Sequence, residues 1–319
     1  MKKVIIHAGL HKTGTSAVQS YLAHHRDILY KAGIFYPPTH SFEAHHGLSS
    51  RLNSNRTSLE DAIKNVNRTL TTMSNMSDSD TLLLSSEMFS ENVDPRSFKY
   101  LPEIFSEIDF VIYVRRQDEL LESAYNQQVK QNGESRLITD YKPYLTNIYE
   151  HLKWFEDSVP NSRVKAFVYD KSHLLNANVV NDFLQKALNI DKPKLNHTNK
   201  KKLVNKSLSP IACLLMARVN ELIRDKSERG LVLDYLVEEL PITKFSNYKL
   251  LTDEYEENLF SSLLISNRNL DDEYLNKEYM AKLTIRNKDY LSLNVAKTIA
   301  GDLGILDKLY KEFDLVGDI

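Results

Sequence analysis

The stretch KVIIHAGLHKTGTS, residues 3–16, indicates the fold of this chain. It begins with the apolar run Val4–His7, which has the length and composition of a buried strand. The loop Gly9–Ser16 follows, and apolar residues then recur at helical spacing as far as Leu29. In this order of strand, loop and helix, backbone N–H groups and a helix N-terminus converge on a phosphate. The sequence therefore predicts an anion-binding loop at the end of a buried strand.

Four further short apolar runs follow the first, and segments with helical spacing separate them. These runs are Ile34–Tyr36, Thr81–Ser85, Phe110–Val114 and Val164–Tyr169. Strands that alternate with helices are typical of an α/β protein with a doubly wound parallel sheet. Beyond residue 200, helical patterns dominate at Ile211–Arg224, Tyr255–Asn267 and Asn294–Phe313. We therefore expect an α/β core over residues 1–200 and a mainly helical extension over residues 201–319 that packs on the core or caps it.

Smaller signals predict where helices begin and end. Gly33 suits the C-terminal cap of the helix that passes through Leu29. Ser209 and Pro210 have the pattern of an N-cap followed by proline at the first helical position. Asp191–Lys206 is polar, rich in lysine and interrupted by proline, so we expect a surface loop there.

The composition excludes several classes of function. The 41 basic residues nearly balance the 43 acidic ones, and the net charge of −2 gives no general attraction for nucleic acid or an anionic membrane. The single cysteine, Cys213, cannot form an intrachain disulfide, and the first residues lack the apolar core of a signal peptide. No apolar run approaches the roughly 18 residues of a membrane span. We expect a cytoplasmic protein without nucleic-acid or integral membrane contacts, in which apolar helix faces could also serve an oligomer.

The loop differs from an ordinary nucleotide-binding loop at one decisive position. The pattern G-x-x-x-x-G-K-[ST] requires lysine directly after the second glycine, where this chain has Thr15. Its lysine comes earlier, at Lys12, so the loop does not match that of a common kinase or GTPase. The alternative is a plain strand-to-helix turn in which glycine relieves strain and Lys12 is merely solvated.

The displaced-lysine loop His7–Ser16 resembles the 5′-phosphosulfate-binding loop of sulfotransferases that use 3′-phosphoadenosine 5′-phosphosulfate (PAPS). The resemblance implies a P-loop-like nucleotide site whose residues from Thr13 to Ser16 hold the 5′-phosphate. It also implies that Lys12 neutralises charge on the bridging oxygen as the sulfuryl group leaves. The residues assigned to cofactor binding in this loop are His11, Lys12, Thr13, Gly14, Thr15 and Ser16.

A second landmark of the same family is a strand that ends in arginine with a serine eight residues later, both of which hold the 3′-phosphate. Arg115 and Ser123 fit this description, and a guanidinium offers a planar fork to phosphate oxygens. The neighbouring Arg116 competes for the role of Arg115. Tyr169 ends a later strand, as a tyrosine near the adenine does in the family, although packing in the core explains it equally well.

Sulfuryl transfer also needs a base for the acceptor proton. Glu87 follows the apolar run Thr81–Ser85 and is the first candidate, and His46 is the second. Glu87 could instead cap the next segment or pair with a cation. The adjacent His45 and His46 point in different directions and belong to no recognisable ligand set, so we expect no metal site.

The sequence thus favours a metal-independent sulfotransferase that moves a sulfuryl group from PAPS to a hydroxyl or amine and releases 3′-phosphoadenosine 5′-phosphate. The residues from Asn205 to Pro210 resemble bacterial members of the family, which often act on saccharides, so a glycan is the first acceptor to consider and a lipid or small phenol the second. The alternatives are a small-molecule kinase of the P-loop class and a non-catalytic carbohydrate-binding scaffold.

Overall fold

The computed structural model describes residues 1–10, 12–39, 43–53, 55–91, 93–141, 147–190 and 207–313. The chain forms two compact units, each built from three segments. The first contains Met1–Arg116, Asn147–Asn196 and Leu263–Lys282. The second contains Gln117–Thr146, His197–Ser262 and Leu283–Ile319. The predicted boundary at residue 200 does not coincide with these units, because residues 117–146 belong to the second unit and residues 263–282 to the first. A division into independently folding domains at this residue stays a prediction.

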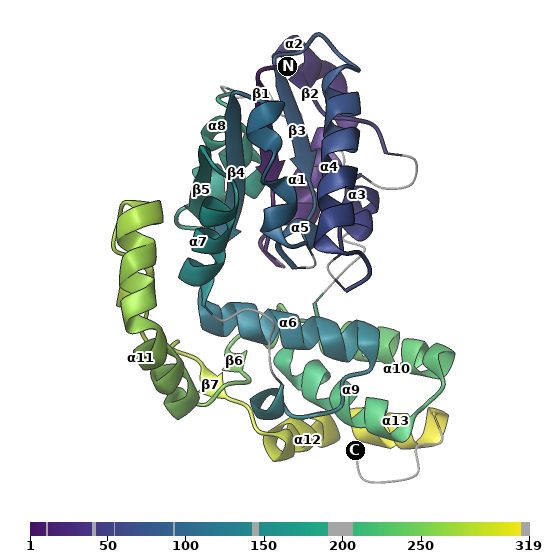
Figure 1. Cartoon of the computed structure of the whole chain (residues 1–319). Helices are drawn as coiled ribbons and strands as arrows, with labels where there is room; N and C mark the ends of the chain where they lie inside the picture. Colours follow the sequence, from purple (N-terminus) through teal and green to yellow (C-terminus); the bar gives the residue numbers. More distant parts are fainter. Residues whose placement is uncertain are drawn as a thin grey trace. The chain divides into compact units, whose positions relative to one another are not determined.

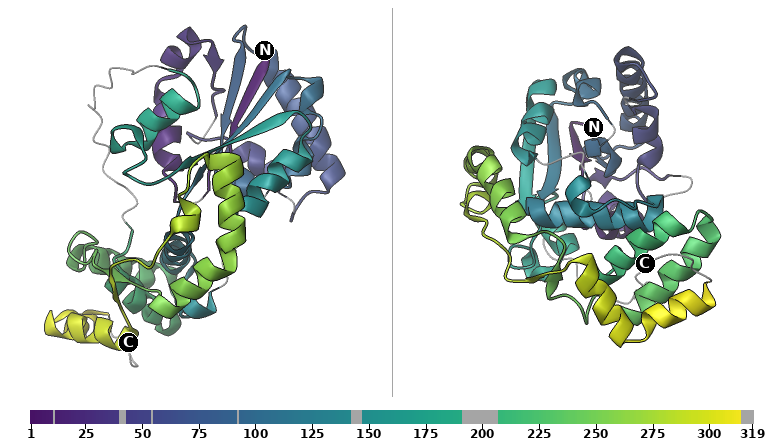
Figure 2. Two further views of the ribbon diagram at one scale, coloured as in Figure 1. Left: turned by 90° about the vertical axis from the view of Figure 1, so that its left-hand side faces the viewer. Right: turned by 90° about the horizontal axis from the view of Figure 1, so that it is seen from below.

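The first unit is built on a five-stranded parallel sheet with the strand order β2-β3-β1-β4-β5. Each expected apolar run forms one of its strands. They are β1 (Lys3–His7), β2 (Ile34–Phe35), β3 (Thr81–Ser85), β4 (Glu107–Val114) and β5 (Ser162–Val168). Helices cover both faces of the sheet, as the left view of Figure 2 shows. The predicted α/β class with a doubly wound parallel sheet is therefore confirmed.

Apolar side chains from alternate strand positions attach the helices to the two faces. On one face α1 (Thr15–His24), α2 (Arg26–Lys31) and α8 (Val179–Lys186) bury Leu22, Leu29 and Phe183, respectively, against the sheet. The opposite face carries α4 (Leu59–Ser74), α7 (Ile148–Ser158) and the 3₁₀ turn η1 (Pro95–Phe98). There the ring of Phe110 lies 5.9 Å from that of Phe98 and 5.1 Å from that of Phe155.

Shorter elements complete the first unit. They are α3 (His46–Arg51), α5 (Met88–Glu91) and the 3₁₀ turns η2 (Leu101–Glu103) and η4 (Leu175–Ala177). The late segment Leu263–Lys282 includes the end of α11 (Asp253–Leu270), the π-helical turn η5 (Asp271–Leu275) and η6 (Met280–Lys282). It is fixed to α7 because the Tyr274 hydroxyl donates to Glu156 at 2.8 Å and the Tyr149 hydroxyl donates to Glu273 at 2.9 Å.

The second unit is mainly helical, as predicted for the C-terminal region, and Figure 1 labels its helices. Its helices are α6 (Gln117–Asn132), η3 (Ile138–Asp140), α9 (Pro210–Leu222), α10 (Lys226–Glu239), α12 (Leu293–Asp302) and α13 (Ile305–Glu312). Helix α9 is buried along most of its length and packs against α6, α10 and α12. Two short parallel strands, β6 (Tyr248–Lys249) and β7 (Asp289–Tyr290), were not expected from the sequence.

Several predicted helix ends are confirmed, and two predicted helices are interrupted. The Ser209 hydroxyl accepts the N–H of Ala212 at 3.2 Å and so caps α9 at its N-terminus. Gly33 takes the left-handed conformation, with φ 75°, directly after Ala32, the C-cap of α2. The helix expected through Leu29 breaks at His25 into α1 and α2, and the last expected helix breaks at Gly304, where φ is 69°. The predicted loop Asp191–Lys206 lies outside the described residues.

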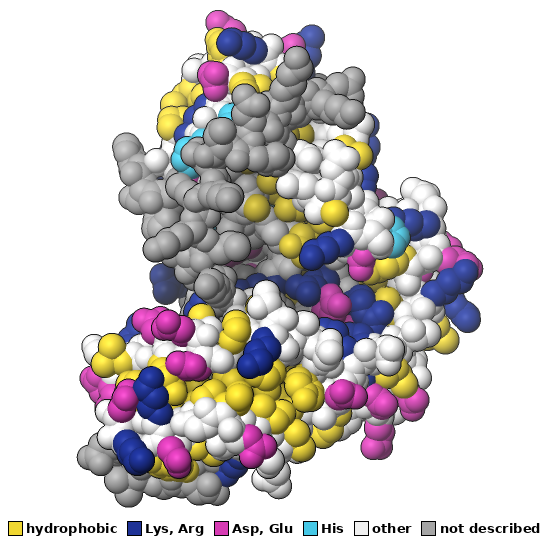
Figure 3. All heavy atoms as spheres, turned by 180° about the vertical axis from the view of Figure 1, so that it is seen from behind, with side chains coloured by type: hydrophobic (Ala, Val, Ile, Leu, Met, Phe, Trp, Pro, Cys, Tyr) yellow, Lys and Arg dark blue, Asp and Glu magenta, His cyan; other side chains and the backbone are white. Residues whose placement is uncertain are grey.

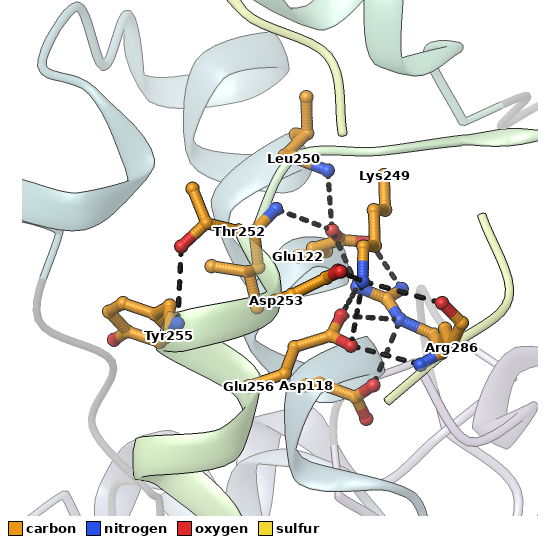
Figure 4. Close-up of polar contacts among 10 residues, drawn as sticks. Asp118, Glu122, Lys249, Leu250, Thr252, Asp253, Tyr255, Glu256 and Arg286 are labelled. Carbon is orange, nitrogen blue, oxygen red and sulfur yellow. Dashed lines mark hydrogen bonds and ion pairs between the residues drawn. The ribbon is translucent and has the colours of Figure 1, made fainter. Parts of the chain in front are cut away.

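Five charged residues of the second unit form a compact group, here called the ionic cluster: Asp118, Glu122, Lys249, Glu256 and Arg286 (Figure 4). Arg286 contacts Asp118 at 2.9 Å, Glu122 at 2.6 Å and Glu256 at 2.6 Å. The Lys249 ammonium contacts Glu256 at 3.0 Å. Burial alone would lower the pKa of Arg286, but its carboxylate partners, Glu122 first, raise it above the usual value. The ionic cluster ties α6, β6, α11 and the segment before β7 together.

Part of the surface of the second unit is apolar. Figure 3 shows hydrophobic side chains gathered in the lower part of the view, among interspersed basic and acidic ones. Exposed apolar residues of this unit include Leu231, of which 63% is accessible, and Leu303. An oligomer formed through such a surface stays a prediction.

Candidate functional site

The site residues predicted in the first unit lie at the carboxyl ends of its strands. The loop after β1 leads by way of α1 and α2 toward β2, on one side of β1, whereas β4 pairs with β1 on the other side. Connections therefore diverge at β1, and ligands of open α/β sheets bind where the connections diverge, outside the carboxyl ends of the strands. The loop Gly9–Ser16 and Arg115, which follows β4, flank this point.

The loop after β1 has a sharply turned backbone. Lys12 and Gly14 both take positive φ values, 63° and 78°. A Cβ atom on Gly14 would lie 2.9 Å from both the Tyr169 ring and the Val179 side chain, so only glycine fits between α1 and these neighbours. The Thr13 hydroxyl donates to the carbonyl of Leu10 at 2.7 Å and closes the turn.

The loop leads directly into the N-terminus of α1, and an anion site of this kind needs such a helix N-terminus. Gly14 is the N-cap of α1, and neither a capping side chain nor an acidic residue occupies the first turn among the described residues. The first N–H groups of a helix carry partial positive charge and have no partner within the helix. Thr15 and Ser16 supply the first of these groups, so this end of α1 can receive an anion.

Glu87 lies beside the start of α1. It follows β3, and its carboxylate accepts a hydrogen bond of 2.7 Å from the Thr15 hydroxyl. Because this hydroxyl donates to Glu87, Thr15 contributes its backbone N–H rather than its hydroxyl proton to an anion. The hydrogen bond places an acidic group at the loop, as a general base near a transferring group requires.

His46 is attached to the same end of β3. It is the first residue of α3, and its Nδ1 lies 2.8 Å from the hydroxyl of Ser86, the residue directly before Glu87. The preceding residue anchors α3, because the His45 N–H donates to the Ser85 carbonyl at 2.8 Å and the Ser85 N–H donates to His45 Nδ1 at 3.1 Å. The two candidate bases are therefore held at one strand end.

Arg115 connects the end of β4 with the loop after β1. Its Nη1 donates to the carbonyl of Lys12 at 3.1 Å, and its guanidinium carbon lies 5.8 Å from the centre of the Tyr169 ring. Tyr169 follows β5, and its N–H donates to the carbonyl of Val114 at 2.7 Å. Arg115 thus contacts both the loop after β1 and the residue after β5. That these three residues bind a cofactor stays a prediction.

For the other predicted residues, the structure gives no test of their place in the site. Ser123 lies on α6 in the second unit, and His11 lies outside the described residues, so their assignment to the cofactor stays a prediction. Arg116 is half-buried at the end of the first unit. The choice between Arg115 and Arg116 for the 3′-phosphate also remains a prediction.

A buried layer beneath the loop was missed as a feature of the site. His7 ends β1, and its Nδ1 lies 2.8 Å from the Ser85 hydroxyl at the end of β3. Burial lowers the pKa of His7 to about 3, so its imidazole is neutral at physiological pH. Its Nε2 has no hydrogen-bond partner among the described residues and lies on the side of Gly9, where an added Cβ would be 3.4 Å away. The feature of the sequence that could have revealed this layer was the position of His7, two residues before the first glycine of the loop.

In the parts of the chain that the structure describes, no group of three or more His, Cys, Asp or Glu side chains is arranged to hold a metal ion. Among the same residues, no helix combines the length and hydropathy needed to cross a membrane.

No family model matches the sequence. A protein of Archaeoglobus fulgidus, described only as an uncharacterized protein, is 36% identical over 129 residues, which make up 40% of this chain. The match spans about a third of that protein's length, 35%. The crystal structure of a sulfotransferase from Alicyclobacillus acidocaldarius, 12% identical, has a TM-score of 0.46 over 88% of this chain and 98% of its own. Similarity at this level decides neither family nor function, so the proposals below depend on the residues themselves.

Proposed function

We propose that the first unit binds PAPS as a substrate and transfers its sulfuryl group to a hydroxyl or amine of an acceptor. The observation that carries this proposal is the hydrogen bond of 3.1 Å from Arg115 to the carbonyl of Lys12. This bond joins two residues far apart in the sequence, one proposed for each phosphate-bearing end of the nucleotide. The Tyr169 ring beside them offers a flat apolar surface of the kind on which a purine stacks.

The residues present fit a nucleotide with a 5′-terminal anion. Glycine is required at position 14 for the turn, and a Cβ on Gly9 would meet the Thr15 methyl group at 2.1 Å, so the backbone is closely folded at the start of α1. The first turn of α1 has no acidic residue, and Lys12 brings a positive charge into the loop. These features favour a dianionic or phosphosulfate group at the helix N-terminus.

The candidate site residues have different roles in the proposed transfer. Lys12 neutralises the charge that develops on the leaving phosphate oxygen, as a preorganised cation does in other group transfers. Arg115 holds the loop through the carbonyl of Lys12, and we assign it to a phosphate on the ribose. Glu87 or His46 accepts the proton of the attacking group. No residue has to form a covalent intermediate.

The proposal is tested by calorimetry without magnesium, using 3′-phosphoadenosine 5′-phosphate, adenosine 5′-phosphate and ATP. We expect the bisphosphate to bind most tightly. A charged hydrogen bond contributes about 1.5–3 kcal/mol, so Arg115→Ala should weaken bisphosphate binding roughly 10- to 150-fold. Arg96→Ala, which changes an exposed arginine paired with Asp94, is the matched control and should bind as the unchanged protein does.

The same titrations separate two roles of Arg115. If its guanidinium binds the 3′-phosphate, Arg115→Ala weakens the bisphosphate and leaves adenosine 5′-phosphate unaffected. If Arg115 only holds the loop, both ligands weaken alike. Binding of ATP in preference to the bisphosphate, or binding that depends on magnesium, would contradict the sulfotransferase proposal.

A small-molecule kinase is the second candidate, and one contact favours it. In P-loop enzymes a hydroxyl at the start of the helix and an acidic residue at the end of a neighbouring strand hold magnesium together. The Thr15 hydroxyl and Glu87 are in contact in this way. A magnesium-dependent gain in ATP affinity that Glu87→Gln abolishes would support the kinase.

For the acceptor we propose a glycan hydroxyl, with a lipid or small phenol as the alternative. Trp154 on α7 is 43% exposed and could stack on a sugar ring. Transfer of labelled sulfate from PAPS to a panel of glycans, phenols and lipids identifies the class. A protein that binds the bisphosphate and glycans but never transfers sulfate would be the non-catalytic scaffold instead.

A further inference from the structure

His7 is a buried polar residue at the base of the loop after β1. Its side chain is only 1% exposed, and its backbone carbonyl accepts the Ser86 N–H at 3.1 Å. The imidazole lies between two aromatic rings, with ring centres 4.8 Å away for Phe183 and 6.4 Å away for Tyr113. The Tyr113 hydroxyl donates to Asp182 at 2.9 Å. These rings therefore shield the imidazole from water without accepting a hydrogen bond from it.

The contact of His7 with Ser85 indicates which ring nitrogen carries the proton. Nδ1 lies 2.8 Å from the buried Ser85 hydroxyl, which has no other partner among the described residues. Burial lowers the pKa of His7 to about 3, so the ring is neutral at physiological pH and carries one N–H. With this proton on Nδ1, both the Ser85 hydroxyl proton and the lone pair of Nε2 would lack a partner. When Ser85 donates to Nδ1 instead, only the N–H of Nε2 lacks one, so this tautomer is favoured.

The Nε2 atom lies beneath the loop that we propose to hold an anion. It has no hydrogen-bond partner in the described parts of the chain. A Cβ on Gly9 would lie 3.4 Å from Nε2 and 2.1 Å from the Thr15 methyl group. Nε2 is therefore close to the point where Gly9 approaches the first residue of α1. The partial positive charge at the N-terminus of α1 acts at this same loop.

We infer that His7 binds the anion held by this loop, by donating a hydrogen bond from Nε2 to one of its oxygens. The inference rests on the proposed function for the identity of the ligand, in which the anion is the 5′-terminal phosphate or phosphosulfate group. Because the ring is shielded from solvent, the loop has to shift at Gly9 as the anion enters. A buried donor without an acceptor costs free energy, so the new hydrogen bond favours this shift.

A neutral donor at this place adds specificity to the site. The charge of Lys12 attracts an anion from any direction, whereas an N–H in a fixed ring requires an oxygen close to its own axis. Ser85 holds the ring in the donating tautomer and is a positioning residue, because it acts through His7. His7 therefore distinguishes nucleotides that have a 5′-terminal oxyanion from those that lack one.

The tautomer is measured by long-range proton–nitrogen NMR correlation on the full chain labelled with ¹⁵N, and His7→Asn assigns the signals. We expect a protonated Nε2 and an unprotonated Nδ1. Addition of 3′-phosphoadenosine 5′-phosphate should shift the Nε2 proton downfield, as a new hydrogen bond does, and leave the signals of the exposed His24 in place. A His7 ring protonated at Nδ1 would overturn the inference, because its Nε2 could only accept.

Two substitutions separate the donor at Nε2 from the rest of the side chain. Glutamine places an amide N–H near the position of Nε2, whereas asparagine is too short to reach it. By calorimetry, His7→Asn should bind 3′-phosphoadenosine 5′-phosphate about 10- to 150-fold more weakly, the effect of losing a hydrogen bond to a charged group. Adenosine 3′-phosphate, which has no 5′ anion, should bind as before. His7→Gln should recover most of the lost affinity.

His24→Asn, at the exposed end of α1, is the matched control and should bind as the unchanged protein does. Equal weakening in His7→Asn and His7→Gln, or no weakening in either, would overturn the inference. Thermal unfolding without ligand checks the fold of each variant. If His7→Asn does not fold, the NMR titration is made on the unchanged protein with His7→Gln to assign the signals, and it decides by itself.

Inorganic phosphate and sulfate distinguish failure of this inference from failure of the proposed function. An unchanged protein that does not bind the bisphosphate, yet binds inorganic phosphate in a way that His7→Asn weakens, would refute the proposed function and leave the role of His7 standing. If the unchanged protein and His7→Asn bound the bisphosphate equally well, the proposed function would stand and His7 would be a structural residue only.

Discussion

The two ends of the central strands use polar residues in opposite ways. At the amino ends, the fully buried carboxylate of Asp109 on β4 is surrounded by cations from β1 and β5. Lys3 lies at 2.8 Å, Arg163 at 2.8 Å and Lys165 at 3.0 Å from its oxygens. At the carboxyl ends, the backbone turns through the left-handed conformation at Lys12, and Arg115 donates to its carbonyl.

The difference teaches what each end contributes. Opposite charges that surround a buried acid neutralise it and join neighbouring strands, so that end contributes to stability. A non-glycine residue with positive φ costs free energy, and such positions gather at functional sites. The carboxyl ends therefore hold the residues that we propose to act on a substrate. The ionic cluster of the second unit resembles the amino ends, because its charges also contact one another in the interior.

The largest expected effect is the loss of stability in Arg286→Met. This change leaves Asp118 and Glu256 buried without their arginine partner, which costs about 3–5 kcal/mol. Urea unfolding followed by circular dichroism measures the loss. Arg96→Ala removes an exposed ion pair and should cost at most about 1 kcal/mol. Equal losses in the two variants would show that the ionic cluster does not stabilise the fold in the way described.

Lys12→Ala should have the next largest effect, on turnover rather than on stability. Removing a group that neutralises charge in the transition state lowers kcat about 100- to 1,000-fold. Lys2→Ala, at the exposed amino end of β1, is the matched control and should retain full activity. Steady-state kinetics and thermal unfolding are measured on both variants. If Lys12→Ala still transferred sulfate at the full rate, Lys12 would not act in the transfer, and the carboxyl ends of the strands would lose this evidence of a functional role.

Asp109 should make stability depend on pH. Burial alone would raise its pKa, but hydrogen bonds from Lys3, Lys165 and Arg163 hold the pKa below the usual value. Its contribution is therefore complete above the unfolded-state pKa of about 3.9 and is lost as the pH falls through the lower folded-state pKa.

We expect Asp109→Asn to be less stable than the unchanged protein near neutral pH by about 1.5–3 kcal/mol, the worth of a charged hydrogen bond. Urea unfolding at a series of pH values should show this difference shrink below about pH 4. A difference that stays constant down to the acid limit would mean that the charge of Asp109 is not what joins the strands.

The smallest expected effect concerns the backbone of Lys12. Left-handed φ costs a residue with a Cβ about 1 kcal/mol, so Lys12→Gly should unfold at a higher temperature than Lys12→Ala. Both variants lack the ammonium group and should be equally inactive. If Lys12→Gly is the less stable of the two, the positive φ does not cost stability at this position.

The strands of the first unit were predictable because each is a short apolar run between polar turns. Boundaries inside helical patterns were harder, since the apolar spacing continues through His25 and Gly304 while the backbone breaks at both residues. β6 and β7 have two residues each, too few to show any periodicity. Segment 263–282 joins the first unit through specific contacts, such as that of Tyr274 with Glu156, which no local pattern reveals.

For the candidate site, the loop and the acid after β3 could be proposed from the sequence, because glycine spacing and strand ends can be read from the order of residues; their roles stay predictions. It did not identify Ser85 and Ser86 as partners of His7 and His46. That pairing depends on the register of β1 against β3, in which His7 lies opposite Ser85. Besides the position of His7 next to the loop, the serine pair placed directly before Glu87 was an available signal.

The order in which the segments of the first unit occur in the sequence has a consequence for its folding during translation. Its sheet is finished at β5, yet the turn that fixes α7 through Glu273 and Tyr274 comes more than a hundred residues later. On the ribosome, β5 and α7 must wait for most of the second unit to be translated before these contacts can form. A nascent chain stalled before residue 263 should therefore expose α7 to proteases or chaperones that the finished protein escapes.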